Sequence, residues 1–581
     1  MSTHATDAGP SSFWRRCVFS VDHKVIGLQF LAYSAFFLVL GGLLSLAIRW
    51  QLAWPWSKVP LVGAALYPET GGVMTPEGYT VLFTLHGTIM IFFVVVPLLL
   101  GAFGNFLLPL MLGARDMAFP RLNLASFWLM VPAGIVALAS FFVASGGPAS
   151  GWTAYPPLST LARAAPGSGA GQTLWLLALF LAGVASTLGA INYVATVIQL
   201  RAEGMTWTRL PLTVWSLFFS SIIQLVALPV LTGGALLQLA DRLLGTGFYT
   251  PAHVVVNQFS PEAAGQATGG LPLLWQHLFW FYSHPAVYVM VLPAMGMVSD
   301  VLAVHGRKPV FGYKPMVLSM GVIVVLGMFV WGHHMFVSGL DPAAGTAFML
   351  STILIALPSS VKVFNWLATL WGARPRYDAA FLNAVGFVAL FVIGGLSGLW
   401  LASTPVDVPL HDTALVVGHF HFVVFGGSMF AVFAALHHWF PKMTGRRLDE
   451  RLGKLHFVGT FVLTACVFLL MHQLGMAGQP RRVADPYVYG GLAHLKPVNE
   501  FITKSAFLLA AWQLVLVVNV VKTLLSKPTG ERDPWGANTL EWQTPSPPPH
   551  GNFEGEPVVF RGPYEYGGDG ERDHARQTEP A

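Results

Sequence analysis

The stretch "TALVVGHFHFVVFGGSMFAVFAAL" (residues 413–436) contains no charged side chain apart from any protonated histidine. A helix that crosses a bilayer needs about 20 predominantly apolar residues, so this stretch is long enough to span a membrane. It also carries two histidines, His419 and His421. Polar side chains at membrane depth are costly and usually functional. The stretch therefore predicts both a membrane-spanning helix and a functional site within it.

Apolar runs of similar length recur along the 581 residues. They lie at about 26–48, 80–108, 123–145, 172–199, 213–239, 273–299, 315–337, 343–370, 381–402, 413–436, 455–475 and 500–525. We expect an all-α, polytopic membrane protein with about twelve transmembrane helices. A short N-terminal segment, 1–25, precedes this domain at 26–525, and a Pro- and Gly-rich surface tail, 526–581, follows it. The punctuated stretch 241–272 predicts an excursion outside the membrane.

The composition excludes most other protein classes. Hydrophobic residues make up 54% of the chain and charged residues only 10%, whereas soluble domains carry about 25% charged residues. The chain is therefore neither a soluble enzyme nor disordered. The net charge of +5 gives no reason to expect a nucleic-acid partner. Two cysteines, Cys17 and Cys466, are too few for a disulfide framework, an iron–sulfur cluster or a thiolate metal centre.

Basic residues follow the even-numbered predicted helices: Arg115, Arg121, Arg201, Arg209, Arg307, Lys308, Arg374, Arg376, Lys442, Arg446, Arg447 and Arg451. The positive-inside rule then puts both termini in the cytoplasm, with the chain in the cell's inner (plasma) membrane. Arg49, Arg481 and Arg482 break this pattern on the outer side. We expect these three cations to have buried anionic partners.

Six histidines fall within or at the end of the predicted helices: His86, His284, His333, His334, His419 and His421. One intramembrane histidine is often a hydrogen-bonded packing residue. Six with paired spacings favour metal ligands, because neutral imidazole is the commonest nitrogen ligand of redox metals. His419 and His421 are about 200° apart around a helix. They can therefore bind two different groups, such as two haems.

A second pair of histidines is adjacent in sequence. His333 and His334 stand about 100° apart at the predicted end of helix 315–337, where both can reach one ion with His284 as a third ligand. Three imidazoles without a thiolate suit copper or zinc, and copper is the better choice beside haems. Tyr288 follows His284 by four residues and shares its helical face. A tyrosine there can supply a hydrogen atom or an electron to bound oxygen.

At these residues the chain resembles subunit I of the haem–copper oxidases, in particular the cytochrome c oxidase type. The resemblance covers about residues 18–550. It is carried by "VDHKVIG", "TLHGTIMIFF", "GNFLLPLMLGARDMAFPRLN", "GWTAYPPLS", "WQHLFWFYSHPAVYV", "KPVFGY", "WGHHMF", "LPSSVKVFNW", "HDTALVVGHFHFVVFGG" and "QPRRV". These motifs occur in the order that the family has them.

The resemblance implies a set of cofactor sites. The implied metal ligands are His86 and His421 for a low-spin haem, His419 for a high-spin haem, His284, His333 and His334 for the copper CuB, and His411 and Asp412 for magnesium. The implied haem contacts are Arg49, Trp152, Trp280, Arg481 and Arg482. Tyr288 resembles the catalytic tyrosine that is covalently linked to His284, and the two haems are expected to be haem a and haem a3.

The resemblance also implies two proton pathways. Lys362, with Ser299, Ser359 and Tyr288, resembles the K-pathway, and a lysine inside a membrane helix is costly unless it is used or paired. The D-pathway residues would be Asp116, Asn105, Asn123 and Asn192.

The predicted helix 273–299 departs from the family pattern. Most relatives have glutamate where this chain has Ala286. Tyr282 and Ser283 precede that position by four and three residues, on nearly the same face. This "YSHP" form resembles a subgroup in which the two hydroxyls replace the carboxylate. We therefore expect proton pumping to persist through Tyr282 and Ser283.

The implied activity is reduction of O2 to water with electrons from cytochrome c, delivered through a CuA-bearing subunit II in a complex that includes subunit III. A quinol oxidase is a weaker alternative, since Gly78 and Val81 stand where quinone-binding side chains are expected. A nitric oxide reductase is weaker still, because Tyr288 and Lys362 are present. A twelve-helix transporter would show internal repeats, and none is visible. His437 and His438 are interpreted as interfacial.

Overall fold

The computed structural model describes residues 12–143, 146–161, 169–250, 270–567 and 573–580. The α-helices are α1 (His23–Ala53), α2 (Gly63–Leu66), α3 (Pro76–Thr88), α4 (Asn105–Leu112), α5 (Pro120–Ala139), α6 (Ala170–Gln199), α7 (Leu212–Leu244), α8 (Pro272–Gly306), α9 (Tyr313–Gly327), α10 (Pro342–Leu354), α11 (Ala356–Leu370), α12 (Ala379–Ala402), α13 (Thr404–Leu410), α14 (Ala414–Phe420), α15 (Phe430–Thr444), α16 (Glu450–Met476) and α17 (Lys496–Leu524). Within these ranges β-structure is limited to isolated bridges.

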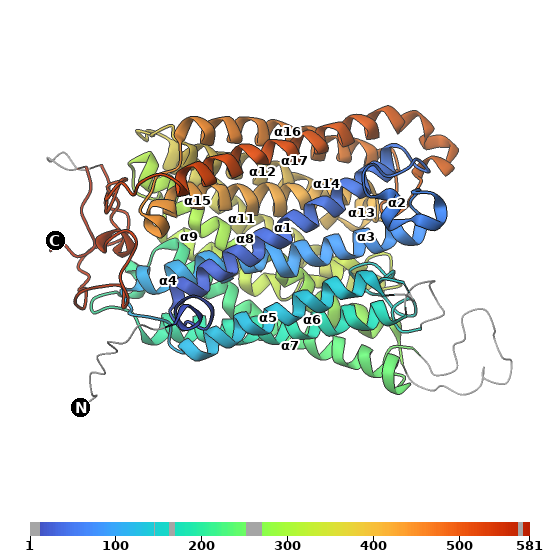
Figure 1. The fold of residues 1–581 in the computed structure, drawn as a ribbon, viewed down its shortest axis with the longest axis horizontal. Helices are drawn as coiled ribbons and strands as arrows, with labels where there is room; N and C mark the ends of the chain where they lie inside the picture. Colours follow the sequence, from blue (N-terminus) through green and yellow to red (C-terminus); the bar gives the residue numbers. More distant parts are fainter. Residues whose placement is uncertain (1–11, 144–145, 162–168, 251–269, 568–572, 581) are drawn as a thin grey trace.

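The helices form one bundle whose members run along the long axis of the molecule (Figure 1). Among the described residues, eleven helical segments are long and apolar enough to cross a membrane, and the shorter α9 is a twelfth apolar helix. These twelve correspond to the twelve predicted spans, so the prediction of an all-α polytopic membrane protein is confirmed. Residues 251–269, in the predicted excursion 241–272, lie outside the described residues.

Several helices begin at residues that cap their free N–H groups. The carboxylates of Asp22, Asp378 and Asp449 accept backbone N–H bonds in the first turns of α1, α12 and α16. Such caps satisfy donors that have no partner inside the helix. Proline at the first position starts α3, α5, α8 and α10, where its missing N–H costs nothing.

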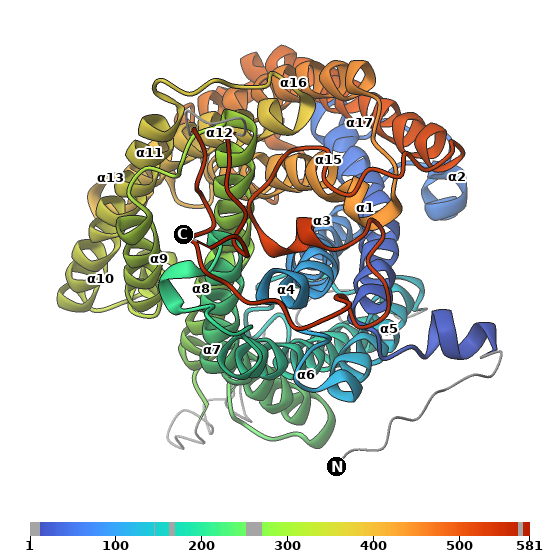
Figure 2. The ribbon, with the colours of Figure 1, turned by 90° about the vertical axis from the view of Figure 1, so that its left-hand side faces the viewer.

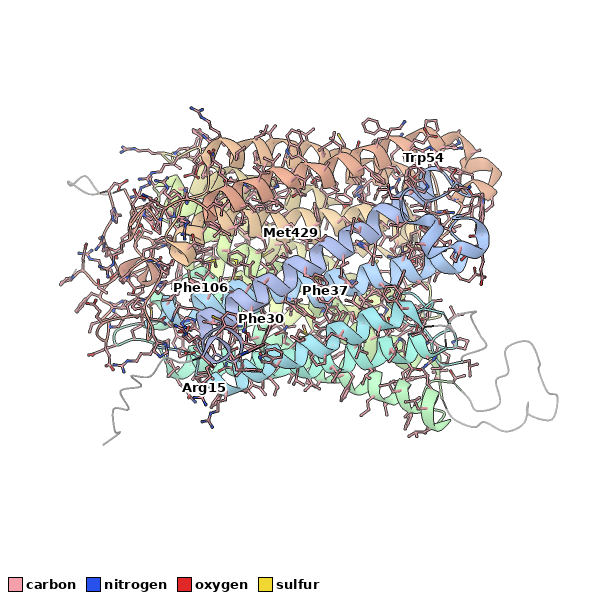
Figure 3. The ribbon with its side chains drawn as sticks, in the orientation of Figure 1. Arg15, Phe30, Phe37, Trp54, Phe106 and Met429 are labelled. Carbon is pink, nitrogen blue, oxygen red and sulfur yellow. The ribbon has the colours of Figure 1, made fainter. Side chains whose placement is uncertain are left out.

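Two membrane spans contain π-helical stretches. Ile89–Val95 and Pro97–Gly104 join α3 to α4, and His421–Met429 joins α14 to α15. Phe93 of the first stretch stacks on Phe37 of α1 with ring centres 5.2 Å apart; Figure 3 labels Phe37 on its helix. Wider turns of this kind are frequent at functional sites because they redirect side chains.

The predicted helix 315–337 is shorter than expected. α9 ends at Gly327, and a separate 3-10 helix, Trp331–Met335, carries His333 and His334. A Cβ at Gly332 would lie 2.2 Å from the Phe348 ring. The turn thus sits too close to α10 for any larger residue at this position.

The C-terminal segment is more buried than a surface tail would be. Trp535, Leu540 and Trp542 are at most 3% exposed, and the segment crosses one end of the bundle (Figure 2). Asn552 accepts a hydrogen bond from the Lys24 ammonium at 2.8 Å and donates one to the Ala114 carbonyl at 2.8 Å. The apolar side chains of the C-terminal segment cover the helix ends. The overall polarity of the segment gives no sign of this burial in the sequence.

The interfacial interpretation of His437 and His438 is wrong. Both are buried, and Trp535 of the C-terminal segment donates its indole N–H to the His438 carbonyl at 2.8 Å. His438 Nδ1 lies 2.8 Å from His305 Nε2, and His305 Nδ1 lies 2.6 Å from the Asp378 carboxylate. His438 therefore belongs to an internal polar network, whereas His437 Nδ1 bonds to the Phe433 carbonyl of its own helix.

Candidate functional site

A single large cavity gathers all six histidines predicted as haem or copper ligands. It measures about 2120 Å³ and is lined by His86, His284, His333, His334, His419 and His421. Ligand pockets are typically about 300–1,000 Å³, so this cavity has room for more than one large group. Its walls also include Tyr288, Trp152, Trp280, Arg49, Arg481 and Arg482.

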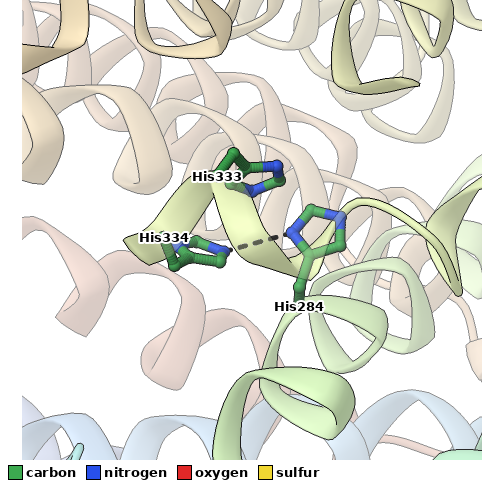
Figure 4. A group of neighbouring side chains, drawn as sticks. All are labelled: His284, His333 and His334. Atoms are coloured by element: carbon green, nitrogen blue, oxygen red, sulfur yellow. Dashed lines mark hydrogen bonds between the residues drawn. The ribbon is translucent and has the colours of Figure 1, made fainter. Parts of the chain in front are cut away.

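His284 of α8 and the pair His333 and His334 converge within this cavity (Figure 4). Ligand nitrogens of the three residues all lie within 4.8 Å of one another. His284 Nδ1 is 3.1 Å from His334 Nε2, and His333 Nδ1 is 2.9 Å from the Thr352 hydroxyl. The kink after α9 brings the adjacent histidines to one point, as the sequence predicted.

Two aromatic side chains flank this group of three histidines. The Tyr288 ring centre is 4.8 Å from that of His284, and the buried His284 Nε2 has no hydrogen-bond partner among the described residues. Trp280 stacks on His334 at 3.9 Å and 12°, and its indole N–H donates to the Tyr155 hydroxyl at 2.6 Å. These contacts hold two of the imidazoles in fixed orientations.

His86 and His421 face each other across another part of the cavity. Their ring planes are nearly parallel, at 9°, with centres 6.4 Å apart. Each Nδ1 lies at hydrogen-bond distance from a backbone carbonyl, His86 from Gly41 at 2.9 Å and His421 from Val417 at 2.8 Å. This leaves Nε2 of each ring as the nitrogen available to a ligand.

His419 points to a different side from His421. Its Nδ1 lies 2.8 Å from the Gly394 carbonyl and 3.1 Å from the Ser397 hydroxyl, both on α12. A Cβ added at Gly398 would lie 2.9 Å from this imidazole. The ring therefore packs directly against Gly398, and a larger residue at that position would displace it.

At one end of the cavity, residues 411–414 run alongside residues 479–482. Thr413 and Pro480 form an antiparallel bridge, and Arg481 donates to the Asp412 carboxylate at 2.5 Å. The nearby arginines and His411 hold the pKa of Asp412 below its usual value despite partial burial. His411 Nδ1 is 3.1 Å from Asp407, which sequence reasoning missed although it lies four residues earlier on α13.

The two other unusual arginines have no carboxylate partner among the described residues. Arg49 donates to the carbonyl and side chain of Asn499 at 3.0 Å and to Thr503. Burial, with Arg481 nearby, lowers the pKa of Arg482 to about 10. Among the described residues, the expected anionic partner is therefore found only for Arg481, and Arg482 is a half-buried cation that lines the cavity, as Trp152 does.

Lys362 of α11 is completely buried, and its ammonium has no hydrogen-bond partner among the described residues. It lies 5.4 Å from the Trp366 ring centre, and the Trp366 N–H donates to the Ser299 hydroxyl at 2.9 Å. Ser359, three residues before Lys362, lines the large cavity together with Tyr288. The structure thus brings the predicted K-pathway residues together beside the cavity.

The predicted D-pathway residues gather at the end of the bundle that the C-terminal segment covers. Asp116 lies in the loop after α4, where burial raises its pKa to about 6. Asn192 accepts a hydrogen bond from the Phe119 N–H at 2.8 Å. Neither amide atom of Asn123 has a partner among the described residues, nor does Asn105 Oδ1. Buried amides without partners favour bound water.

Tyr282 and Ser283 are both at most 3% exposed. Ser283 lines the large cavity with Ala286, and its hydroxyl has no partner among the described residues. Tyr282 stacks on Phe92 with ring centres 6.3 Å apart. The two hydroxyl residues therefore lie between the core of the bundle and the cavity.

The donor set fits two haems and a copper ion. Two imidazoles that bind one metal from opposite sides, with bonds of about 2.0–2.1 Å, have ring centres roughly 6 Å apart, close to the 6.4 Å of His86 and His421. His419 lines the same cavity. The three converging imidazoles, with no thiolate or carboxylate among them, match the preference of copper.

Comparisons with known proteins agree with this geometry. Residues 25–529 match the family described as "Cytochrome C and Quinol oxidase polypeptide I". The chain is 46% identical to cytochrome c oxidase subunit 1 of Thermostichus vulcanus, over 94% of this chain and 92% of that protein. It is 43% identical to the alternative cytochrome c oxidase subunit 1 of Bradyrhizobium diazoefficiens, over 98% of this chain and 94% of the relative.

The fold is also shared with a solved structure. A haem–copper terminal oxidase dimer superimposes with a TM-score of 0.71 at 20% identity, covering 87% of this chain and 85% of the other. The family match spans most of the chain, and the two curated relatives exceed 40% identity over nearly its full length. The chain therefore belongs to the cytochrome c and quinol oxidase polypeptide I family, the subunit I proteins of the haem–copper oxidases.

Proposed function

We propose that this chain is the catalytic subunit of a terminal cytochrome c oxidase, which reduces O2 to water and is an oxidoreductase of the respiratory chain. The observation that carries the proposal is the convergence of His284, His333 and His334 beside Tyr288, on a cavity that three further histidines share. As a family member it binds haems and CuB, works with other oxidase subunits and cytochrome c, and is located in a membrane.

We assign the ligands as the family pattern implies. His86 and His421 hold the low-spin haem and His419 holds the high-spin haem, while the three converging histidines hold CuB. Bound there, these groups supply four-electron transfer to oxygen. The hydrogen bonds from Nδ1 to backbone carbonyls or the Ser397 hydroxyl fix each haem-ligating ring in its tautomer.

The haems are proposed to be haem a and haem a3, with Arg49 beside the low-spin haem. Arg481, Arg482 and Trp152 would meet the propionates. Arg482 supports this, because a half-buried cation that lines the cavity with no carboxylate partner among the described residues is suited to an anionic group. Magnesium would bind His411 and Asp412, and the nearby Asp407 oxygen adds a hard ligand to that end of the cavity.

Protons must reach the site, since each electron that enters a low-dielectric region adds uncompensated negative charge. We assign Lys362, Ser299, Ser359 and Tyr288 to the K-pathway and Asp116, Asn105, Asn123 and Asn192 to the D-pathway. The buried, unpaired ammonium of Lys362 supports this, because such a cation is costly unless it carries protons. Tyr288, close to His284, is positioned to donate a proton and an electron, and we propose that it is covalently linked to His284.

The chain has Ala286 where most relatives carry a glutamate, and we propose that it belongs to the "YSHP" subgroup. Tyr282 and Ser283 would then pass pumped protons along water. The free Ser283 hydroxyl facing the cavity supports that role. Moving each charge against the membrane field costs about 2.3 kcal/mol per 100 mV, which is the energy that pumping stores.

We propose that the complex includes a CuA-bearing subunit II and a subunit III, and that it lies in the plasma membrane with both termini in the cytoplasm. The basic loops predicted at the cytoplasmic ends support this orientation. Oxygen consumption by the purified complex tests the function. Reduced cytochrome c should support turnover and a quinol should not, whereas turnover with quinol alone would overturn the assignment of the donor.

A further inference from the structure

A second, small cavity lies apart from the large one, among α1, the Pro97–Gly104 stretch, α5, α6 and α7. It measures about 40 Å³. One water needs roughly 10–15 Å³ by this measure, so the cavity has room for two or three. Its polar lining residues are Asn105, Ser126, Ser186, Tyr193, Ser221 and Gln224.

Gln224 of α7 is the unusual member of this lining. Its side chain is 3% exposed, and no hydrogen bond joins it to any other described residue. By contrast, Tyr193 donates to the Leu100 carbonyl and Ser221 donates to the Leu217 carbonyl at 2.8 Å. A buried carboxamide in a polar cavity without protein partners is satisfied by water.

The packing of α7 on α8 gives the height of Gln224 in the bundle. A Cβ at Gly296 of α8 would lie 2.1 Å from the Ser216 hydroxyl oxygen of α7, so these two residues are in register. The helices are antiparallel. Gln224 lies eight residues after Ser216 on α7, and Tyr288 lies eight residues before Gly296 on α8. The amide therefore lies at the height of Ala286–Tyr288, where α8 carries no carboxylate.

The small cavity also shares a wall residue with the proposed D-pathway. Asn105, one of the proposed pathway asparagines, lines its wall and has an unpartnered Oδ1. On the other side of the small cavity, the Pro97–Gly104 stretch separates the small cavity from the large one. Leu98 faces the large cavity, whereas Pro97 and Leu100 face the small one.

We propose that Gln224 is a positioning residue of the D-pathway, whose carboxamide holds a short chain of water between Asn105 and the hydroxyls of Tyr282 and Ser283. The inference rests on the proposed function of the chain. An amide orients water without storing a proton, so the proton passes between waters and no bond of Gln224 is formed or broken. The role suits a chain in which α8 provides only hydroxyl groups at this height.

The test compares two variants. Gln224→Leu keeps most of the bulk of the side chain and removes its polar atoms, whereas Gln224→Glu keeps polar atoms at the end of the side chain. In the holoenzyme, Gln224→Leu should lower oxygen consumption by about tenfold and reduce the protons pumped per electron in vesicles, with an unchanged haem spectrum. Gln224→Glu should keep most of the oxygen consumption and most of the protons pumped per electron. Ser220→Ala is the matched control, since Ser220 is buried one turn away and its hydroxyl donates to the Ser216 carbonyl at 2.7 Å.

Parental turnover and pumping in Gln224→Leu would overturn the inference. If that variant does not assemble, Gln224→Met provides a second apolar side chain of similar length and the same expected loss. Asp116→Asn distinguishes a failure of the role of Gln224 from a failure of the D-pathway itself. Slow turnover in Asp116→Asn with a normal Gln224→Leu contradicts only the role of Gln224, whereas normal turnover in both contradicts the D-pathway on which it rests.

Discussion

The imidazoles of His86 and His421 lie nearly parallel, at 9°, with ring centres 6.4 Å apart, although 335 positions separate them in the chain. His86 comes from α3 and His421 begins the π-helical stretch after α14. Their Nδ1 atoms are occupied by backbone carbonyls, which leaves both Nε2 atoms for one shared ligand.

This pair predicts that the low-spin haem depends on both rings. Replacing His86 by alanine should remove the six-coordinate low-spin signal from the optical and electron paramagnetic resonance spectra, because the iron loses one strong axial ligand. His437→Ala is the control, since His437 is a buried histidine that lies outside the cavity. A full low-spin signal in His86→Ala would contradict the assignment.

Lys362→Met should leave the haem spectrum intact and lower steady-state turnover by about 100-fold or more, as expected when a proton-carrying group is removed. The buried ammonium has no hydrogen-bond partner among the described residues, so its loss leaves no protein group unsatisfied. Oxygen uptake measures the effect. Lys504→Met, at an exposed position, should behave as the parent enzyme, and substantial oxygen uptake by Lys362→Met would mean that the K-pathway is misassigned.

Tyr282→Phe and Ser283→Ala should each reduce the number of protons pumped per electron in vesicles. Each substitution removes a hydroxyl and little volume, and Tyr282→Phe keeps the ring contact with Phe92. Pumping is measured from the acidification outside vesicles during a few turnovers. Unchanged stoichiometry in both variants would exclude these hydroxyls as the replacement for the missing carboxylate.

Asp116 should titrate near pH 6, because burial raises its pKa to about 6 from a usual value of 3.8. A raised pKa means that the folded protein binds this proton more tightly than the unfolded chain does. The carboxyl should therefore be mostly protonated at pH 5 and mostly ionised at pH 7, when it can take up protons. Infrared spectra compared with those of Asp116→Asn measure this titration. A midpoint below pH 4 would contradict the burial.

The spans could be predicted, and the candidate ligands could be singled out, because both signals are local. Apolar runs of helix length mark the spans, and histidines such as His284 are conspicuous within them. The convergence of His333 and His334 on His284 followed from their adjacency, although the break that separates them from α9 did not. That break depends on the contact of Gly332 with Phe348, which involves another helix.

Other features depend on packing that no short sequence pattern records. Trp535 and Trp542 lie in a polar, Pro-rich segment, and only the bundle end beneath them explains their burial. The sequence around His438 favours an interfacial position, because the segment that covers it comes almost a hundred residues later in the chain. Gln224 stands out in the sequence as a polar residue inside an apolar helix. Its role could be inferred only from the cavity that it lines.

The most direct test of the central claim is a count of iron, copper and haem in the purified complex, made for the parent chain and for His284→Asn. Two haems per chain are expected in the parent, together with one copper that is lost in His284→Asn while the low-spin haem signal remains. A parent complex without haem absorption, or a copper content that His284→Asn leaves unchanged, would contradict the account.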